Sequence, residues 1–162
     1  MTGLRVGTGF DAHRLVAGRK LMLGGVEVAH HRGLEGHSDG DCLVHALCDA
    51  MLGAAGEGDM GRHFPSADPR WMNASGASFL ERTVRIVDAR GFTVENVDVT
   101  VIAQEPALAP HIDRMRDALA RSLALEAERV SVKAKSTDGL GTIGRGEGIA
   151  AIAAVLLSKR EE

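Results

Sequence analysis

The chain has 162 residues, of which 44% are hydrophobic and 25% charged, and its net charge is −3. These values are typical of globular proteins, and the length predicts one domain over residues 1–162. A slightly acidic chain with four Phe, one Trp and no Tyr offers neither the cationic surface nor the stacking platform of nucleic-acid-binding proteins. No apolar run approaches the ~20 residues that span a bilayer, so we expect no membrane partner.

The first half of the chain is predicted to form a strand, a hairpin and a helix. The strand covers residues 4–10, and the hairpin covers 20–30, where two apolar runs flank a glycine pair. A helix is expected to begin near Ser38 or Asp39 and to end in glycines, because apolar residues recur between them at helical spacing. Residues 57–65 are expected to form a loop.

The second half is predicted to add two helices and two alternating strands. The helices cover 75–91 and 110–125, and the strands cover 93–104 and 130–138. Ser75 or Ser78 is expected to cap the first of these helices, and Pro110 to lie in the first turn of the second. Residues 147–158 leave two alternatives open, since alanine favours a helix and a continuous apolar run suits a buried strand. The pattern indicates mixed α and β structure in one domain.

Two cysteines, Cys42 and Cys48, lie six residues apart in the first predicted helix. This spacing puts them on different helix faces, so a disulfide bond between them is not expected. Reduced thiols are typical of cytosolic proteins, and we therefore predict a cytoplasmic location.

Acids and histidines recur at spacings that suit a metal site. Asp11 and His13 lie two residues apart, so on an extended segment both side chains leave the same face. Asp41, His45 and Asp49 follow one another at four-residue intervals on one face of the first predicted helix. Asp11, His13 and His45 would leave the fourth position of a tetrahedral zinc ion open, with Asp41 and Asp49 orienting a ring. By spacing alone, a hydrogen-bonded helix histidine and a turn-capping acid are an equally open alternative.

Two glycine stretches imitate a dinucleotide-binding fingerprint. Residues 7–12, GTGFDA, leave too few residues for the helix that this motif needs before the next strand. Residues 139–144, GLGTIG, are not followed by the strand and the ribose-binding acid that complete the unit. Neither stretch is expected to bind a dinucleotide.

A polar strand end at residues 133–138, KAKSTD, carries two cations, two hydroxyls and an acid. This set suits a phosphate and an oxygen-preferring cation such as magnesium, although a solvated strand end is the simpler explanation of it. Phosphate contacts beside an open zinc site would indicate phosphoryl-transfer chemistry.

Four stretches of the chain carry a resemblance to one known family. They are GFDAHRL, HSDGDCLVHALCDAMLGAAGEGDMGRHFP, NVDVTVIAQEPALAPHI and VKAKSTDGLGTIGRGEGIAA. In this order and spacing, from about Gly7 to Ala151, they strongly resemble the 2-C-methyl-D-erythritol 2,4-cyclodiphosphate synthase family of non-mevalonate isoprenoid biosynthesis. The resemblance implies a single α+β domain, with about three helices packed on a mixed sheet, that assembles as a homotrimer with active sites between subunits.

The resemblance also implies a reaction and its metal ions. A phosphorus–oxygen lyase of this family converts 4-diphosphocytidyl-2-C-methyl-D-erythritol 2-phosphate into the 2,4-cyclodiphosphate and CMP. In this reaction the 2-phosphate of the substrate attacks its β-phosphate. The matching zinc ligands are Asp11, His13 and His45, with one Zn²⁺ per active site. Asp138 matches an acid that binds Mg²⁺ or Mn²⁺ with the substrate diphosphate.

Further residues match positions that contact the substrate. His37 and Ser136 match catalytic positions, one steadying the transition state and the other near the α-phosphate. The remaining matches lie at the methylerythritol end (Ser38, Phe64, Asp68), at the ribose from an adjacent subunit (Asp59, Met60, Gly61), at the cytosine and diphosphate (Ala103, Gln104, Glu105, Pro106, Ala107, Leu108, Lys135, Thr137) and at a cavity on the trimer axis (Arg145).

Four positions depart from the family pattern. Asp138 is one methylene shorter than the usual glutamate, and Ala107 stands where many members have lysine. Ser66 replaces a frequent aspartate. Thr142 replaces a common phenylalanine, so the resemblance does not settle whether the axial cavity binds an isoprenoid diphosphate.

Two other functions remain open from the residues themselves. A mononuclear zinc phosphohydrolase would use the open metal position to hold hydroxide. A non-catalytic trimeric module would bind nucleotides or isoprenoid diphosphates through its glycine loops and Arg145.

Overall fold

Two long strands from opposite ends of the chain pair along most of their length. In this computed structural model, which describes residues 3–160, β1 (Leu4–Ala17) runs antiparallel to β7 (Gly148–Lys159). They form part of a five-stranded sheet of order β4-β1-β7-β5-β6. Its other strands are β4 (Arg32–Leu34), β5 (Phe92–Ile102) and β6 (Val130–Lys135). Only the β5–β6 pair of this sheet is parallel, because a crossover helix connects these two strands.

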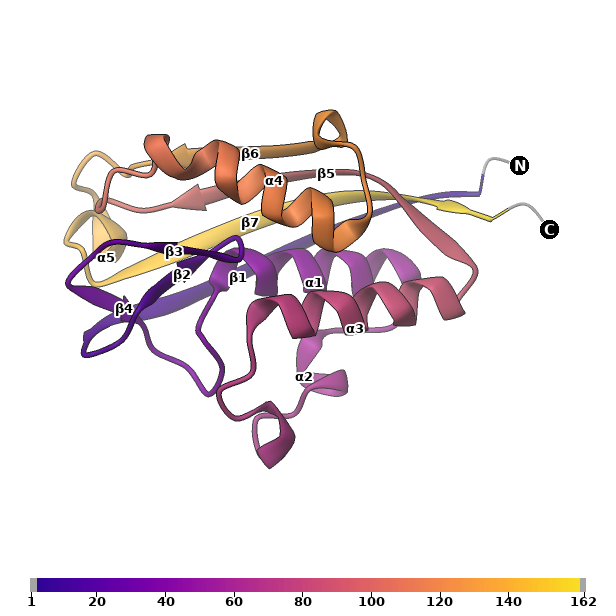
Figure 1. Cartoon of the computed structure of the whole chain (residues 1–162), viewed down its shortest axis with the longest axis horizontal. Coiled ribbons are helices and arrows are strands. Elements are labelled where there is room, and N and C mark those ends of the chain that lie inside the picture. Colours follow the sequence, from indigo (N-terminus) through magenta and orange to yellow (C-terminus); the bar gives the residue numbers. More distant parts are fainter. Residues whose placement is uncertain (1–2, 161–162) are drawn as a thin grey trace.

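Three long helices lie on one side of the sheet (Figure 1). They are α1 (Cys42–Ala55), α3 (Gly76–Ala89) and α4 (Ile112–Leu123), and two helices of four residues, α2 (Met60–His63) and α5 (Gly141–Gly144), complete the set. The α1 helix packs on β1 and β7, α3 packs on α1, and α4 covers β6. The α+β class and the three packed helices are therefore confirmed, with two short helices in addition.

Glycines in β1 allow α1 to approach the sheet closely. A Cβ atom at Gly7 would lie 2.0 Å from the Ala50 carbonyl oxygen, and one at Gly9 would lie 2.0 Å from that of Ala46. Because the helix backbone sits directly on the strand, residues of α1 come within side-chain reach of the next residues of β1. This packing brings His45 to Asp11.

Several predicted elements are confirmed. The 20–30 segment forms the hairpin of β2 (Leu21–Leu23) and β3 (Val26–Val28), and Ser75 caps α3. Both cysteines are buried and free. The GTGFDA stretch lies inside β1, which agrees with the exclusion of a dinucleotide fingerprint there. Among the described residues, no helix combines the length and apolar character needed to cross a membrane.

Other expectations need correction. The cap of α1 is Asp41 and not Ser38 or Asp39, because the Asp41 carboxylate accepts a hydrogen bond from the Val44 amide. Residues 57–65 contain the α2 helix, which Asp59 caps in the same way through the Arg62 amide.

Two further corrections concern the strands and a proline. The open alternative at 147–158 resolves as β7, and the short strand β4 was not predicted. Pro110 lies in a 3₁₀ turn, Ala109–His111, that precedes α4. Two more 3₁₀ turns, Pro69–Trp71 and Ala127–Arg129, are part of the connections.

Candidate metal centre and substrate pocket

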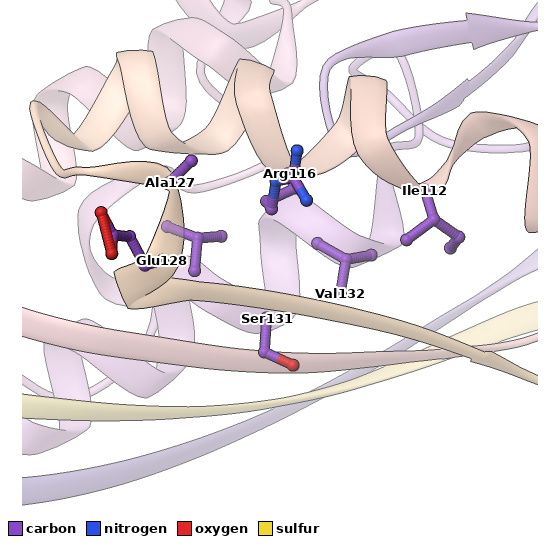
Figure 2. Close-up of a pocket in the computed structure, with 7 residues that line it drawn as sticks. Ile112, Arg116, Ala127, Glu128, Ser131 and Val132 are labelled. Carbon is purple, nitrogen blue, oxygen red and sulfur yellow. The ribbon is translucent and has the colours of Figure 1, made fainter.

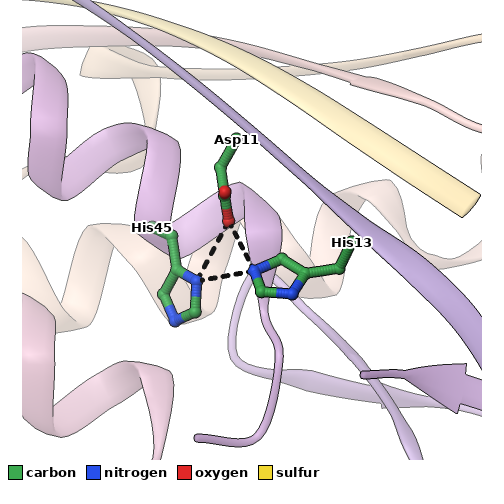
Figure 3. Close-up of side chains that lie close together, drawn as sticks. All are labelled: Asp11, His13 and His45. Atoms are coloured by element: carbon green, nitrogen blue, oxygen red, sulfur yellow. Dashed lines mark hydrogen bonds and ion pairs between the residues drawn. The ribbon is translucent and has the colours of Figure 1, made fainter. Parts of the chain in front are cut away.

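An acid and two imidazoles meet where β1 faces α1 (Figure 3). The Oδ2 atom of Asp11 lies 2.8 Å from Nε2 of His13 and 3.0 Å from Nδ1 of His45, and these two nitrogens are 3.3 Å apart. Zinc binds such atoms at about 2.0–2.2 Å, so three donors this close can hold one ion. The structure thus brings together the three predicted ligands, and all three are partly buried.

The outer nitrogen of each imidazole also has a partner. Nδ1 of His13 donates to the backbone carbonyl of Glu35, and Nε2 of His45 lies 3.2 Å from the Ser38 hydroxyl. These contacts leave Nε2 of His13 and Nδ1 of His45 free to bind a metal ion on the side that faces Asp11. Such contacts orient ligating histidines and fix their tautomers. Sequence reasoning missed the Glu35 carbonyl, since no side-chain pattern marks it.

Contacts within the triad shift the pKa values of Asp11 and His13. Burial acts to raise the pKa of Asp11, but hydrogen bonds from His13 and His45 outweigh it and hold the pKa well below its usual value. The hydrogen bond to Asp11 is in turn the main cause that raises the pKa of His13. The carboxylate is therefore ionised, as a metal ligand must be.

The two carboxylates expected to orient the ring of His45 bind backbone amides. Asp41 is fully buried and accepts hydrogen bonds from Gly24 (2.9 Å), Gly25 (2.7 Å) and Val44 (3.1 Å). Asp49 accepts one from the Met60 amide at 2.7 Å. Within the described part of the chain, the ring is oriented by Ser38 and not by these acids. Asp49 lies on α1 as predicted, whereas Asp41 caps the helix, and the amide partners of both were not predicted.

A cavity of about 160 Å³ opens beside the triad. Its lining includes the predicted residues His37, Ser38, Met60 and Phe64. It also includes Ser66, which replaces an aspartate that is frequent in the family. Two aromatic residues that were not predicted, Trp71 and Phe79, also line it. The Phe64 ring meets each of them edge-on, with ring centres 5.0 Å apart. The one tryptophan of an aromatic-poor chain was the signal that could have found this wall.

The other residues predicted for the methylerythritol and ribose ends, Asp59, Gly61 and Asp68, lie near lining residues in the sequence but do not line the cavity. Asp59 precedes the first turn of α2, which contains Met60 and Gly61. The Asp68 carboxylate binds the Arg70 side chain and caps a 3₁₀ turn, and it does not line the cavity.

The predicted nucleotide residues gather where β5 and β6 end. The Ala103 amide donates to the Lys135 carbonyl at 2.9 Å, and the Gly139 amide donates to the Gln104 side chain at 3.1 Å. The 103–108 segment therefore lies beside the 135–139 segment, and parallel strands are the reason, since their carboxyl ends share one edge. This cluster also contains Glu105, Pro106, Ala107 and Leu108, with a cis peptide bond at Glu105–Pro106.

The polar strand end has internal contacts. The Ser136 hydroxyl donates to Asp138 at 3.1 Å, and the Thr137 hydroxyl donates to the Leu140 carbonyl at 2.7 Å. Asp138 has a positive φ of 52°, so its backbone turns sharply here. Arg145, farther along, pairs with Glu147 at 2.6 Å.

A second cluster of metal-binding side chains and a second hollow lie outside the triad. His30, His31 and Glu105 also place three donors close together, but Arg32 lies 2.7 Å from the same carboxylate and its charge opposes a cation. A larger hollow of about 550 Å³ lies between α4 and β6 (Figure 2). Its Arg116 is paired with Asp113 and Asp117, and its described lining contains none of the predicted site residues.

The chain is similar to known proteins over nearly its whole length. A family model described as the YgbB family matches residues 4–158. A 2-C-methyl-D-erythritol 2,4-cyclodiphosphate synthase of Syntrophomonas wolfei is 54% identical, over 96% of this chain and 99% of that protein. The bifunctional IspDF of Campylobacter jejuni has a TM-score of 0.95 at 40% identity, over 99% of this chain and 44% of that chain.

A second similar structure is that of a nucleotide complex. It is a 2C-methyl-D-erythritol-2,4-cyclodiphosphate synthase in a CDP-bound form, with a TM-score of 0.88 at 38% identity, over 95% of this chain and 100% of that chain. The similarity to this family that the four sequence stretches indicated is thereby confirmed over nearly the whole chain. The chain belongs to the YgbB family, together with proteins named 2-C-methyl-D-erythritol 2,4-cyclodiphosphate synthase.

Proposed function

We propose that this protein converts 4-diphosphocytidyl-2-C-methyl-D-erythritol 2-phosphate into 2-C-methyl-D-erythritol 2,4-cyclodiphosphate and CMP, a phosphorus–oxygen lyase reaction of non-mevalonate isoprenoid biosynthesis. The observation that carries the proposal is the triad of Asp11, His13 and His45 beside a small cavity. Relatives about 50% identical to the chain bear the name of this synthase, which supports the same conclusion.

The reaction needs no side-chain nucleophile. An oxygen of the 2-phosphate forms a bond to the β-phosphorus, and the bond from that phosphorus to the bridging oxygen breaks. The electron pair leaves with the bridging oxygen on CMP, so neither water nor an external acid enters the balance. The protein's task is therefore to hold the two phosphates in line and to offset their charge.

The donor sets of the site fit two kinds of metal ion. Asp11, His13 and His45 would hold Zn²⁺, which supplies Lewis-acid stabilisation of phosphate charge when bound. Asp138 offers an oxygen ligand of the kind that Mg²⁺ or Mn²⁺ prefers, and Ser136 donates to it. Asp138, one methylene shorter than the usual glutamate, would hold this ion, which would offset charge on the substrate diphosphate.

Each end of the substrate has a matching surface. We place the methylerythritol phosphate in the cavity, where His37 and Ser38 offer polar groups and Phe64 an apolar wall. The cytosine and diphosphate would lie along 103–108 with Lys135, Ser136 and Thr137, a surface rich in backbone groups. Asp59, Met60 and Gly61 would bind the ribose of a substrate held mainly by a neighbouring subunit.

We further propose that three copies of the chain assemble as a homotrimer. The sheet face opposite the helices exposes Val6 and Phe10 from β1 and Ile152 from β7, with exposed fractions of 72%, 61% and 47%. A contiguous exposed apolar face of this kind marks an interface. Arg145 would lie near the axis of such an assembly. The cytoplasmic location predicted from the reduced cysteines stays a prediction.

The test is an assay of the purified protein with the proposed substrate, Zn²⁺ and Mg²⁺, followed by phosphorus-31 NMR. Coupled resonances of a cyclic diphosphate that appear together with CMP are expected, and His45→Ala should abolish them because it removes one of three ligands. Oxygen-18 from labelled water should not enter any product. Labelled phosphate would instead indicate the zinc phosphohydrolase, and an unchanged substrate in the presence of both metals would indicate a binding module.

A further inference from the structure

One irregular segment contacts both imidazoles of the triad. It comprises residues 35–38, between β4 and α1. Its Glu35 carbonyl accepts a hydrogen bond from His13, and its Ser38 hydroxyl lies 3.2 Å from Nε2 of His45. At Gly36 the backbone passes so near that a Cβ atom would lie 3.3 Å from Cε1 of His13. The path of this segment therefore decides where both rings point.

The segment belongs to neither helix nor strand, so its carbonyl groups need other partners. The Glu35 carbonyl is bound by His13, and the His37 carbonyl accepts from the Asn73 amide at 2.7 Å. The two remaining carbonyls, of Gly36 and Ser38, both accept from one side chain, that of Arg19. Nη1 of Arg19 lies 2.9 Å from the first oxygen and Nη2 lies 2.5 Å from the second.

The geometry of Arg19 suits a clamp on the backbone. Its guanidinium is planar and rigid, so two nitrogens at a fixed separation grip two oxygens at a fixed separation. Its own main chain passes close to β4, because a Cβ atom at Gly33 would lie 2.6 Å from the Arg19 carbonyl oxygen. The two gripped carbonyls flank His37, which lines the cavity.

We propose that Arg19 is a positioning residue of the site: by holding the carbonyls on both sides of His37, it sets the path of 35–38 and so the directions of His13, His45 and His37. It touches neither the triad donors nor the substrate. The effect on metal binding and on backbone order follows from the structure alone, whereas the effect on turnover rests on the proposed function.

The test compares Arg19→Ala and Arg19→Lys with a matched control, Lys20→Ala. Lys20 is the next residue, is exposed and pairs with Glu27 at 2.8 Å, away from the segment. Three quantities are measured for each variant: the Zn²⁺ affinity by competition with a chelator, the hydrogen exchange of the Asn73 and Gly40 amides, and kcat and KM with the proposed substrate. Both amides donate to the segment, to the His37 carbonyl and the Ser38 hydroxyl.

For Arg19→Ala we expect the Glu35 and Ser38 contacts to the two imidazoles to weaken. The Zn²⁺ affinity should then fall by up to about 10–100-fold, the effect of losing such an outer contact of a metal ligand. We also expect faster exchange of both amides, and a fall in kcat of about 10-fold or more with a smaller change in KM. Arg19→Lys keeps the positive charge but loses the pair of nitrogens at a fixed separation. Each of the three quantities should therefore lie between its value in Arg19→Ala and its value in the unchanged protein. If Arg19→Ala does not fold, Arg19→Lys carries the comparison alone.

Three results would overturn the proposal. One is a Zn²⁺ affinity and exchange rates for Arg19→Ala that equal those of the unchanged protein. Another is full recovery by Arg19→Lys, which would mean that charge alone matters. The third is an equal loss in Lys20→Ala. If instead the affinity and exchange differences appear while no variant, nor the unchanged protein, turns over the substrate, the positioning role stands and the proposed function fails.

Discussion

Two helix caps of this protein have very different surroundings. Asp41, the cap of α1, is fully buried, and its carboxylate accepts hydrogen bonds from the Gly24, Gly25 and Val44 amides. It thus joins the β2–β3 hairpin turn to the helix that carries His45. Burial raises the pKa of Asp41, and the amide donors act against this rise. Ser75, the cap of α3, is exposed and binds the Ser78 amide.

Replacing these two caps by alanine should have unequal effects on stability. Asp41→Ala leaves three amides in or near the core without an acceptor, which predicts a loss of about 3–5 kcal/mol in the free energy of unfolding. Ser75→Ala should lose about 1 kcal/mol, the ordinary effect of an exposed cap. Asp41→Asn keeps one acceptor oxygen, so its loss in the free energy of unfolding should lie between the losses of the two alanine variants. Urea denaturation at one fixed protein concentration measures all three, and equal losses for the two alanine variants would contradict the importance of burial.

The sequence predicted which residues could bind a metal ion, but it did not predict which groups those residues and their neighbours contact. Asp11 and His13 were recognisable because two residues of extended chain place both side chains on one face. The contacts of Asp41 could not be predicted, since they depend on a hairpin turn that lies sixteen or seventeen residues earlier in the chain. The Glu35 carbonyl and the Arg19 contacts were not predicted either, because an irregular segment has no periodicity from which its contacts could be inferred.

At the scale of elements, periodicity decided which predictions succeeded. The α3 helix has a polar face, and its cap was predicted correctly. The 147–158 segment stayed ambiguous because it becomes β7, a central strand between β1 and β5, where apolar residues face both sides. The β4 strand is only three residues long, too short for any alternation to show.

The contact between β1 and α1 should be the most sensitive packing in the fold. Gly9→Ala puts a methyl group 2.0 Å from the Ala46 carbonyl oxygen, so either the helix or the strand must move. A shift of this backbone contact predicts a loss of at least about 3 kcal/mol, comparable to the larger overpacking effects in cores. Gly53→Ala is the matched control, because Gly53 is an exposed residue of α1 with open space around its Cβ position.

The control should gain stability and not lose it. Alanine in an exposed helix interior is favoured over glycine by about 0.5–1 kcal/mol. Thermal and urea unfolding of both variants provide the comparison, and a Zn²⁺ titration of Gly9→Ala reports whether His45 still reaches Asp11. A Gly9→Ala protein with unchanged stability and unchanged Zn²⁺ affinity would show that the strand and helix are not in close contact.

At the scale of the whole molecule, the sheet has one covered and one uncovered face. Even-numbered residues of β1 point away from the helices, and three large apolar ones among them, Leu4, Val6 and Phe10, are exposed. Phe10 lies directly opposite Ile152 of β7, so the apolar surface continues from strand to strand. The sequence predicts a strand here, but which of its faces the helices cover became clear only with α1 in place. This surface is the one that we assign to the trimer interface.

Val6→Asp should separate the subunits without unfolding them. A carboxylate at a position that is 72% exposed in one chain adds no buried charge to a monomer, but it becomes desolvated when apolar faces close on it. We expect sedimentation velocity to show monomers at micromolar concentrations for Val6→Asp and trimers for the unchanged protein, with the same circular dichroism for both. Met72→Asp, at an exposed methionine outside the sheet, should stay trimeric. Because a ribose-binding loop from a neighbour would complete each site, Val6→Asp should also lose activity, and its residual activity should rise with protein concentration. A trimeric Val6→Asp protein, or a monomeric Met72→Asp protein, would show that this face does not hold the subunits together.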